Sequence, residues 1–569
     1  MSPRSSIRPS IFQHDVWKPE HESRHEASES DIQLHYKRAK LLCRTSGLTI
    51  DDVLHLTPKF WDFHFDMVSA RDMTAFIIST IHLNLCIGTI AGFAASRPDL
   101  ATTLDDLLNF RTCGEFMLTE TGHGLDARNL ETTATLEDNG FFILNTPTFA
   151  AAKAMPPATP LAGISRIAVV FARLFVKGED RGVKPFLTPI NSTEGMCPGI
   201  VTRFLPIRPG TKPLDHSVTT FNNVRLHPSA LLGSTSKAKN EREDFLTQIW
   251  RVSVGTLSLS IMGVSAIKIA GCIAAAYSQR RQIGTGRDGQ TMPIIRFSTQ
   301  NRPILKALAY GEVLHAYALW TVQEFMNPKH NPDVRRGLAA AFKTLVVQSS
   351  HLITELAERC GWQGLFAYNQ IIELASTFQG NSIAEGDTLV ICIRLASELL
   401  MGKYSLPEPN DGNSPLAKHE IGLFQEAAAK LSSMPGGHRG DSFNNNILPR
   451  CRRMIEATGQ RLAYEAALRS PCVAPEVLDL FVRSCIREDA SWYIEHGLGN
   501  HNQIWDDEDE AFTKLNPMLP ELVARTDARD YITAPIVTEE KLEQFIGGLT
   551  TFGNEKDDIL GQLKHKSRL

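Results

Sequence analysis

Residues 117–135 read MLTETGHGLDARNLETTAT, and residues 141–148 continue with FFILNTPT. The stretch consists of short β-like runs joined by turns that carry Gly, Asn and Asp. Between two of these runs, Asp138-Asn139-Gly140 has the composition of a hairpin turn. Similar runs, split by Gly, Pro and Asn, continue to residue 232. The sequence therefore predicts a β domain at residues 111–235.

Apolar residues recur three and four positions apart on both sides of this β domain, as amphipathic helices require. A polar segment at 234–244 and a Pro-, Asn- and Gly-rich segment at 407–415 predict linkers. The helical patterns after the β domain lie at residues 248–282, 310–326, 337–360 and 388–401. The fold class predicted is α+β, mainly α, with a disordered segment at 1–30, a helical domain at 31–110, the β domain, and helical domains at 236–410 and 411–569.

Composition excludes several classes of protein. The chain has 569 residues, more than one hydrophobic core usually holds. Its net charge of -4 gives no electrostatic reason to expect nucleic acid or an anionic membrane as a partner. The ten cysteines show no CxxC pair and no metal-like spacing, so we expect reduced thiols and no metal site. The N-terminal histidines His14, His21 and His25 lie in a segment too polar to fold alone.

Residues 73–95 are apolar over a length that could span a membrane. Arg71 and Asp72 border them, and His82 and Asn84 interrupt them. We therefore expect a buried core helix and no membrane span.

A second informative stretch is Ala384-Glu385-Gly386-Asp387, between the Gly-punctuated residues 358–369 and the apolar residues 388–396. Asp387 suits the N-cap of a helix that begins near Thr388. A capping role alone would account for Glu385-Gly386-Asp387, so a catalytic role for this triplet has to be argued from the surrounding residues.

Together these stretches resemble the acyl-CoA oxidases and the acyl-CoA dehydrogenases. In the oxidases, a Thr-Glu-x-Gly-His-Gly motif precedes Leu-Glu-Thr-Thr-Ala-Thr, as at residues 119–124 and 130–135. The order helical, β, helical, helical is that of the oxidases, whereas the dehydrogenases resemble only the first three parts. The resemblance implies an FAD-dependent acyl-CoA oxidase, most often a homodimer. Such an enzyme converts an acyl-CoA substrate to the trans-2-enoyl-CoA and reduces molecular oxygen to hydrogen peroxide.

The resemblance also implies roles for individual residues. Glu385 matches the base that removes the α-proton of the thioester. Thr119 matches a threonine that hydrogen-bonds the flavin ring, although it could simply end a strand. Arg280, with Arg281 as the alternative, matches an arginine that reaches the FAD pyrophosphate, often from the neighbouring subunit; a basic helix end is its structural alternative. The residues that match cofactor-binding positions are Thr119, Gly124, Arg280, Gln300, Gly364, Gly386 and Asp387.

The sequence departs from the family's pattern at three points. After Lys153, the fatty-acid oxidases usually have two Trp and then Pro-Gly-Gly, where this chain has Ala154-Met155-Pro156-Pro157. Pro157 has no N–H, so a backbone hydrogen bond to the flavin edge is lost or replaced there. Trp362 interrupts the Gly-rich segment, and Thr388 replaces an Asn. The base is retained, but the departures count against a standard straight-chain fatty acyl substrate.

Three alternatives to an oxidase remain. The first is an acyl-CoA dehydrogenase that passes electrons to a carrier, which the additional C-terminal helical domain disfavours. The second is a flavin oxidase or monooxygenase that acts on a secondary-metabolite thioester. The third is a catalytically silent subunit, which the retention of Glu385, Thr119 and Arg280 disfavours.

The last three residues, Ser567-Arg568-Leu569, match the small–basic–Leu pattern of the C-terminal peroxisomal address. This pattern predicts binding by the peroxisomal import receptor and a location in the peroxisome, where β-oxidation begins with an oxidase of this kind.

Overall fold

The structure is a computed structural model that describes residues 27–285, 289–435 and 437–553. The N-terminal histidines and the tripeptide 567–569 lie outside these residues. Of the segment predicted to be disordered, residues 27–30 are described, and there the prediction is wrong because Glu29 already begins α1. The Ser28 side chain caps this helix by accepting a hydrogen bond of 3.2 Å from the Asp31 amide.

Helices form the N-terminal part of the described chain. The stretch predicted as one core helix at 73–95 is divided, because the turns from Ile81 to Ile87 are π-helical. Two stretches, Met73–Ser96 and Trp250–Arg280, are long and apolar enough to cross a membrane, but 78% and 89% of their apolar windows are buried inside the protein. The helical segments are α1 Glu29–Thr45, α2 Ile50–His55, α3 Pro58–Phe65, α4 Val68–Arg71, α5 Met73–Thr80, η4 Ile81–Ile87, α6 Gly88–Ala91 and α7 Ala101–Leu108.

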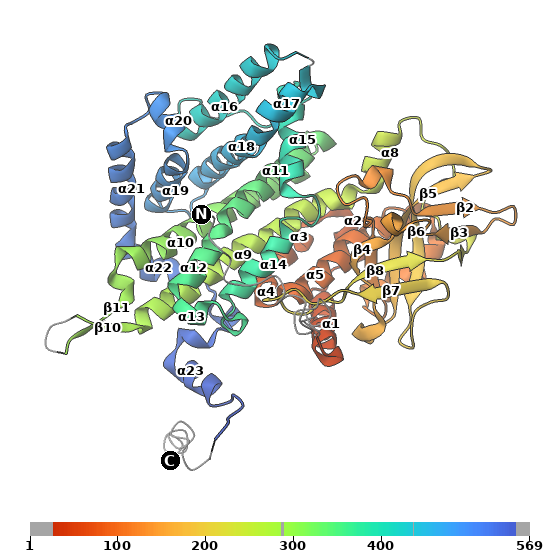
Figure 1. Ribbon diagram of the computed structural model, residues 1–569, viewed down its shortest axis with the longest axis horizontal. Helices are drawn as coiled ribbons and strands as arrows, with labels where there is room; N and C mark the ends of the chain where they lie inside the picture. The colour runs from red at the N-terminus through yellow and green to blue at the C-terminus, as the bar shows by residue number, and fades with distance from the viewer. Residues whose placement is uncertain (1–26, 286–288, 436, 554–569) are drawn as a thin grey trace, which may run out of the picture.

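Two β-sheets follow and lie side by side at one end of the molecule (Figure 1). In the larger sheet the order is β1-β5-β2-β3-β9, with β6 also paired to β5; the smaller has the order β4-β8-β7. Side chains of both sheets, including Val170 and Phe221, share one hydrophobic core. The strands are β1 Cys113–Met117, β2 Thr133–Leu136, β3 Phe142–Asn145, β4 Lys153–Pro157, β5 Arg166–Val176, β6 Glu179–Asn191, β7 Ile200–Phe204, β8 His216–Phe221 and β9 Val224–Leu226.

The predicted hairpin turn is confirmed. Strands β2 and β3 pair antiparallel, with Leu136 opposite Phe142. Gly140 in the turn has a φ of 85°, a conformation that glycine adopts without steric cost.

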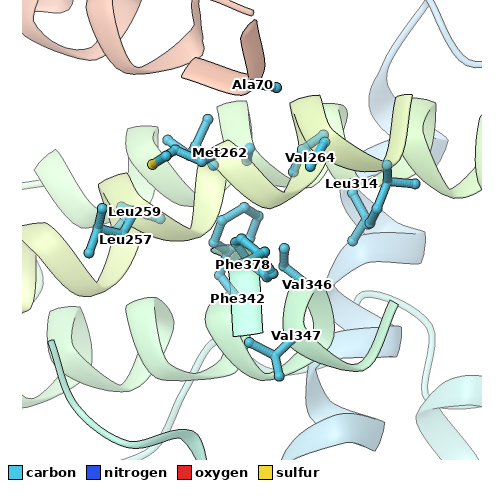
Figure 2. Close-up of a cluster of buried hydrophobic side chains, with 14 of the residues drawn as sticks. Ala70, Leu257, Leu259, Met262, Val264, Leu314, Phe342, Val346, Val347 and Phe378 are labelled. Atoms are coloured by element: carbon cyan, nitrogen blue, oxygen red, sulfur yellow. The ribbon is translucent and has the colours of Figure 1, made fainter. Parts of the chain in front are cut away.

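The long helix α9, Trp250–Arg280, is the centre of the second helical part and packs against α10, α11, α12 and α14. Figure 2 shows Met262 and Val264 of this helix beside Phe342 and Val346 of α11 and Phe378 of α14. The helices and strands of this part are α8 Glu241–Gln248, α9, β10 Gln282–Gly284, β11 Thr291–Pro293, α10 Ser298–Met326, α11 Pro332–Ser349, α12 His351–Arg359, α13 Gly361–Gly364, α14 Ile371–Asn381 and α15 Thr388–Leu400.

Three boundaries in this part differ from those predicted. Helix α8 begins inside the predicted polar linker and takes its last four residues, 241–244, because Asn240 caps the helix and its surface is too polar to show an apolar pattern. Helix α10 begins 12 residues before the predicted start at residue 310, with Pro303 in its second turn, where proline usually breaks a helix. A break at Ser350 separates α11 from α12.

The C-terminal part is also helical. Helix α16 begins at Pro415, and residues 402–414 contain neither helix nor strand, as the linker prediction requires. Its helices are α16 Pro415–Ser432, α17 Asp441–Asn446, α18 Leu448–Arg469, α19 Pro475–Glu488, α20 Ala490–Glu495, α21 His501–Leu515, α22 Leu519–Arg525 and α23 Glu539–Ile546. All ten cysteines are free thiols, and the residues that the structure describes contain no cluster of His, Cys, Asp and Glu able to hold a metal ion.

Candidate active site

Glu385 lies in the turn that joins α14 to α15. Asp387 caps α15, since its carboxylate accepts hydrogen bonds from the Leu389 amide at 3.0 Å and the Val390 amide at 3.2 Å. The predicted cap is therefore confirmed. Both Glu385 and Gly386 have left-handed backbones, with φ values of 55° and 98°. A glutamate in that conformation is uncommon and marks a position that the surrounding structure holds in place.

The Glu385 side chain points into the protein. The residue as a whole is partly exposed, but both carboxylate oxygens are buried and have no hydrogen-bond partner among the described residues. They lie against α9 at Gly255, where an added Cβ would come within 1.4 Å of Oε2. Only glycine leaves room for the carboxylate at this point of the helix.

Burial gives this carboxyl group an unusual proton affinity. Removal from water raises the pKa of Glu385 to about 8, and the positive charge of Lys343 opposes this rise. A buried carboxyl with a pKa near neutral pH can both take up and release a proton, as a general base must. Unpaired buried carboxylates are costly to stability and concentrate at functional sites.

Side chains that the sequence did not reveal support this turn. Lys343 of α11 donates hydrogen bonds of 2.6 Å each to the carbonyls of Ala384 and Gly386. Thr256 of α9 donates one of 2.7 Å to the carbonyl of Glu385. These partners lie 41 to 129 residues away along the chain, so no local motif could have indicated them.

The motif at 119–135 is held together by a buried ion pair. The Glu120 carboxylate accepts hydrogen bonds from the Glu131 amide at 2.7 Å and the Thr132 amide at 2.9 Å. Lys153 of β4 lies 2.9 Å from the same carboxylate, and both side chains are fully buried. This pair explains why the two halves of the motif occur together, because Glu120 of the first half binds the backbone of the second.

The predicted flavin-binding residues of the β region lie beside this pair. The carbonyl of Thr119 accepts a hydrogen bond of 3.0 Å from the Ala154 amide. Its hydroxyl forms no hydrogen bond to other residues in the described part of the chain and can accept or donate one. Gly124 is exposed, and a Cβ added to it would meet nothing within 4 Å.

The altered segment after Lys153 is irregular. The pairing of β4 with β8 shifts between Ala154 and Pro157, and Met155 has a φ of 79° with a half-exposed side chain. His216 bonds the Met155 carbonyl through Nδ1 at 2.8 Å. The departure from the family's pattern is thus accompanied by a bulge at this sheet edge.

Three of the remaining predicted cofactor residues, Arg280, Gln300 and Gly364, gather near the C-terminal end of α9. Gln300 of α10 donates hydrogen bonds to the Ser278 hydroxyl at 2.8 Å and to the Arg359 carbonyl at 2.7 Å. Gly364 packs so closely on α12 that an added Cβ would lie 1.9 Å from the Ala357 carbonyl oxygen. The Arg280 guanidinium forms an ion pair with Glu539 and donates a hydrogen bond of 3.2 Å to the Ile536 carbonyl.

The structure does not bring all of these residues together within one chain. Strands β10 and β11, which follow Arg280, lie at the end of the molecule opposite the β-sheets (Figure 1), and Thr119 follows strand β1 of those sheets by two residues. Gly386 and Asp387 lie with Glu385 at the turn between α14 and α15. Thr119 and Gly124 therefore lie apart from Arg280, Gln300 and Gly364 (Figure 1), while Gly386 and Asp387 accompany Glu385.

The arrangement of helices and sheets agrees with comparisons to known proteins. Residues 257–400 match the family model described as acyl-CoA oxidase, C-alpha1 domain. A putative peroxisomal acyl-coenzyme A oxidase 1.2 of Arabidopsis thaliana is 28% identical over 338 residues, which cover 54% of this chain and 50% of that protein. Human peroxisomal acyl-coenzyme A oxidase 3 is 24% identical over 390 residues, covering 59% and 54%. The chain spans about half the length of the curated relatives it matches.

Solved structures show the same fold over nearly the whole chain. Acyl-CoA oxidase 1 of Yarrowia lipolytica superposes with a TM-score of 0.77 at 19% identity, covering 98% of this chain and 91% of that one. Acyl-CoA oxidase-1 of Caenorhabditis elegans, complexed with FAD and ATP, gives a TM-score of 0.70 at 18% identity, covering 95% of each. The class is thus a mainly helical fold with a central β region. The family model, the relatives and the structures all indicate the acyl-CoA oxidase family.

Proposed function

We propose that this chain is an FAD-dependent acyl-CoA oxidase in which Glu385 removes the α-proton of an acyl-CoA thioester. The observation that carries the proposal is the Glu385 carboxylate itself. It is buried and unpaired among the described residues, and burial raises its pKa to about 8. The naming of the relatives as acyl-CoA oxidases supports the same reaction class.

The chemistry needs a base matched to a weakly acidic proton. The α-proton of a thioester is removed efficiently only by a base whose pKa lies near the operating pH. In this proposal the Glu385 carboxylate takes the proton from Cα, and the hydrogen on Cβ leaves as hydride, which gives the trans-2-enoyl-CoA. FAD, when bound, would accept that hydride, and molecular oxygen would take up the two electrons and two protons as hydrogen peroxide.

The cofactor residues fit FAD in two groups. The free Thr119 hydroxyl and the open backbone at Gly124 suit the flavin ring. Arg280 suits a pyrophosphate, since its guanidinium carries five donors and Glu539 uses part of them. Because one chain holds the two groups apart, we propose that two copies complete the site as a homodimer, with Gln300 and Gly364 on the adenosine side. The FAD-bound relative from Caenorhabditis elegans supports the cofactor assignment.

We propose the peroxisome as the location. Ser567-Arg568-Leu569 would bind the import receptor, and several relatives are named peroxisomal. One observation favours a second candidate of the same class, an oxidase or monooxygenase acting on a specialised thioester. It is the bulged segment Ala154-Met155-Pro156-Pro157, which stands where fatty-acid oxidases have a different sequence.

Peroxide release tests the proposal. Purified FAD-loaded protein is supplied under air with butanoyl-, octanoyl-, hexadecanoyl- and 2-methyl-branched acyl-CoAs, and Glu385→Gln is measured in parallel. Peroxide that requires Glu385 supports the oxidase, and the panel ranks the acyl groups. Flavin bleaching without peroxide identifies a dehydrogenase. If neither peroxide nor bleaching appears with any of these thioesters, the proposal is contradicted, and a non-CoA substrate or a silent subunit remains.

A further inference from the structure

Lys343 of α11 is an almost fully buried lysine that no sequence motif singled out. Its side chain is 2% exposed. The ammonium donates hydrogen bonds of 2.6 Å to the carbonyl of Ala384 and of 2.6 Å to the carbonyl of Gly386. These are the carbonyls on either side of Glu385, so one ammonium group fixes both ends of the residue that carries the base.

We propose that Lys343 is the positioning residue of the active site, which locks the Glu385 turn through the two flanking carbonyls and presents a positive charge to the carboxylate. The assignment rests on the proposed role of Glu385 as the base. It concerns a residue that acts through Glu385 and does not itself touch the substrate.

The backbone of the turn shows why such a lock is needed. Glu385 and Gly386 are both left-handed, and an L-residue leaves that conformation readily unless its neighbours hold it. With Thr256 on the carbonyl of Glu385, two side chains bind three successive carbonyls of the turn. The base is thereby held on a rigid support, which a catalytic geometry requires.

The charge of Lys343 acts at a distance from the carboxylate. Both Glu385 oxygens lack a hydrogen-bond partner in the described part of the protein, so Lys343 acts on the carboxylate through its charge and not through a hydrogen bond. The other titratable groups that act on Lys343 are Asp387, the N-cap of α15, and Cys392 within α15, while α9 presents the uncharged Gly255 and Thr256. Lys343 is therefore the cation that favours the ionised form of Glu385 while leaving its oxygens free to accept a proton.

Three substitutions separate the two parts of this role. Lys343→Met removes both the hydrogen bonds and the charge, Lys343→Gln keeps an amide donor without the charge, and Lys343→Arg keeps the charge. The matched control is Lys268→Met on α9, another largely buried lysine, which faces Glu312 and Arg525 and not Glu385. Thermal unfolding of all four variants measures what the loss of a buried ammonium costs.

The first readout is the pH profile of anaerobic flavin bleaching with octanoyl-CoA. We expect Lys343→Met to slow bleaching by about 100-fold, because a displaced base loses its geometry. We also expect the fall in rate on the acid side of the profile to occur at higher pH in Lys343→Met, because loss of the cation raises the pKa of Glu385. The midpoint of this fall should stay at the wild-type pH in Lys343→Arg and in Lys268→Met, and should be shifted in Lys343→Gln. A Lys343→Met enzyme with the wild-type rate and midpoint overturns the inference.

The second readout needs neither substrate nor FAD. Burial raises the pKa of Glu385 in the folded protein above its value in the unfolded chain. The folded state therefore loses stability as the pH rises between these two values, and Glu385→Gln, which cannot ionise, should have the higher melting temperature at alkaline pH. This gain should be larger in the Lys343→Met background between pH 8 and 9, or in Lys343→Gln if the Met variant does not fold. Equal gains in both backgrounds overturn the inference. Activity that survives in Glu385→Gln alone refutes the proposed function instead, so the two failures are distinguishable.

Discussion

Gly255→Ala is the substitution that probes the position of Glu385 without changing its chemistry. A Cβ at residue 255 would lie 1.4 Å from Oε2 and 2.1 Å from Cδ of Glu385, whereas ordinary contact begins at 3.4 Å. The carboxylate must therefore move by about 2 Å, the difference between 3.4 and 1.4 Å. Since a misplacement of about 1 Å can cost roughly 100-fold in rate, we expect at least that loss, equivalent to about 2.7 kcal/mol of barrier.

The fold should survive this change. Alanine is favoured over glycine in a helix interior by about 1 kcal/mol, and the displaced atoms belong to the end of a flexible side chain. The matched control is Gly271→Ala on the same helix, where the added Cβ meets Leu308 at 3.1 Å and lies away from Glu385. Both variants should keep the wild-type melting temperature within a few degrees.

The assay is stopped-flow bleaching of the flavin at 450 nm under anaerobic conditions with octanoyl-CoA, alongside FAD content and thermal unfolding. We expect Gly255→Ala to be folded, loaded with FAD and slow, and Gly271→Ala to bleach at the wild-type rate. A folded Gly255→Ala enzyme that bleaches as fast as the wild type would show that the carboxylate does not act from its position beside α9.

Three further predictions concern stability and cofactor binding. Glu385→Gln should stabilise the protein by a few kcal/mol above about pH 8 and not below about pH 4.5, because a buried acid with a raised pKa opposes folding once it must ionise. Calorimetry from pH 5 to 9 that shows a constant difference between variant and wild type would contradict this. Lys153→Met should cost about 3–5 kcal/mol in urea unfolding, because it leaves the buried Glu120 carboxylate without its cation, and a cost below about 1 kcal/mol would show that Glu120 is protonated. Glu539→Gln should tighten FAD binding roughly two- to fivefold, since an exposed ion pair of about 0.2–1 kcal/mol no longer competes for Arg280; weaker FAD binding by fluorescence titration would place the pyrophosphate elsewhere.

Local features of this structure could be predicted from the sequence because they depend on neighbours in the chain. The turn at Gly140, the cap at Asp387 and the order of helical and β regions all follow from short-range preferences. Polar or interrupted helices were mispredicted for the same reason. Helix α8 has a weak apolar pattern, and α10 carries Pro303 near its start.

The support of the site could not be predicted in this way. Lys343, Thr256 and Gly255 reach Glu385 from helices that are distant in the sequence, and lysine, threonine and glycine within a helix carry no signal of their own. The pairing of Arg280 with Glu539 joins residues 259 positions apart. Which residues hold FAD, and whether two copies share it, remain predictions from the family resemblance.

The claim that Glu385 takes the α-proton is tested most directly with octanoyl-CoA deuterated at C2. Anaerobic bleaching of the FAD-loaded wild type should be several-fold slower with the deuterated than with the ordinary thioester, and Glu385→Gln, folded and loaded with FAD, should bleach with neither. A Glu385→Gln protein that bleaches at the wild-type rate, with the same isotope effect, would contradict the assignment of the base.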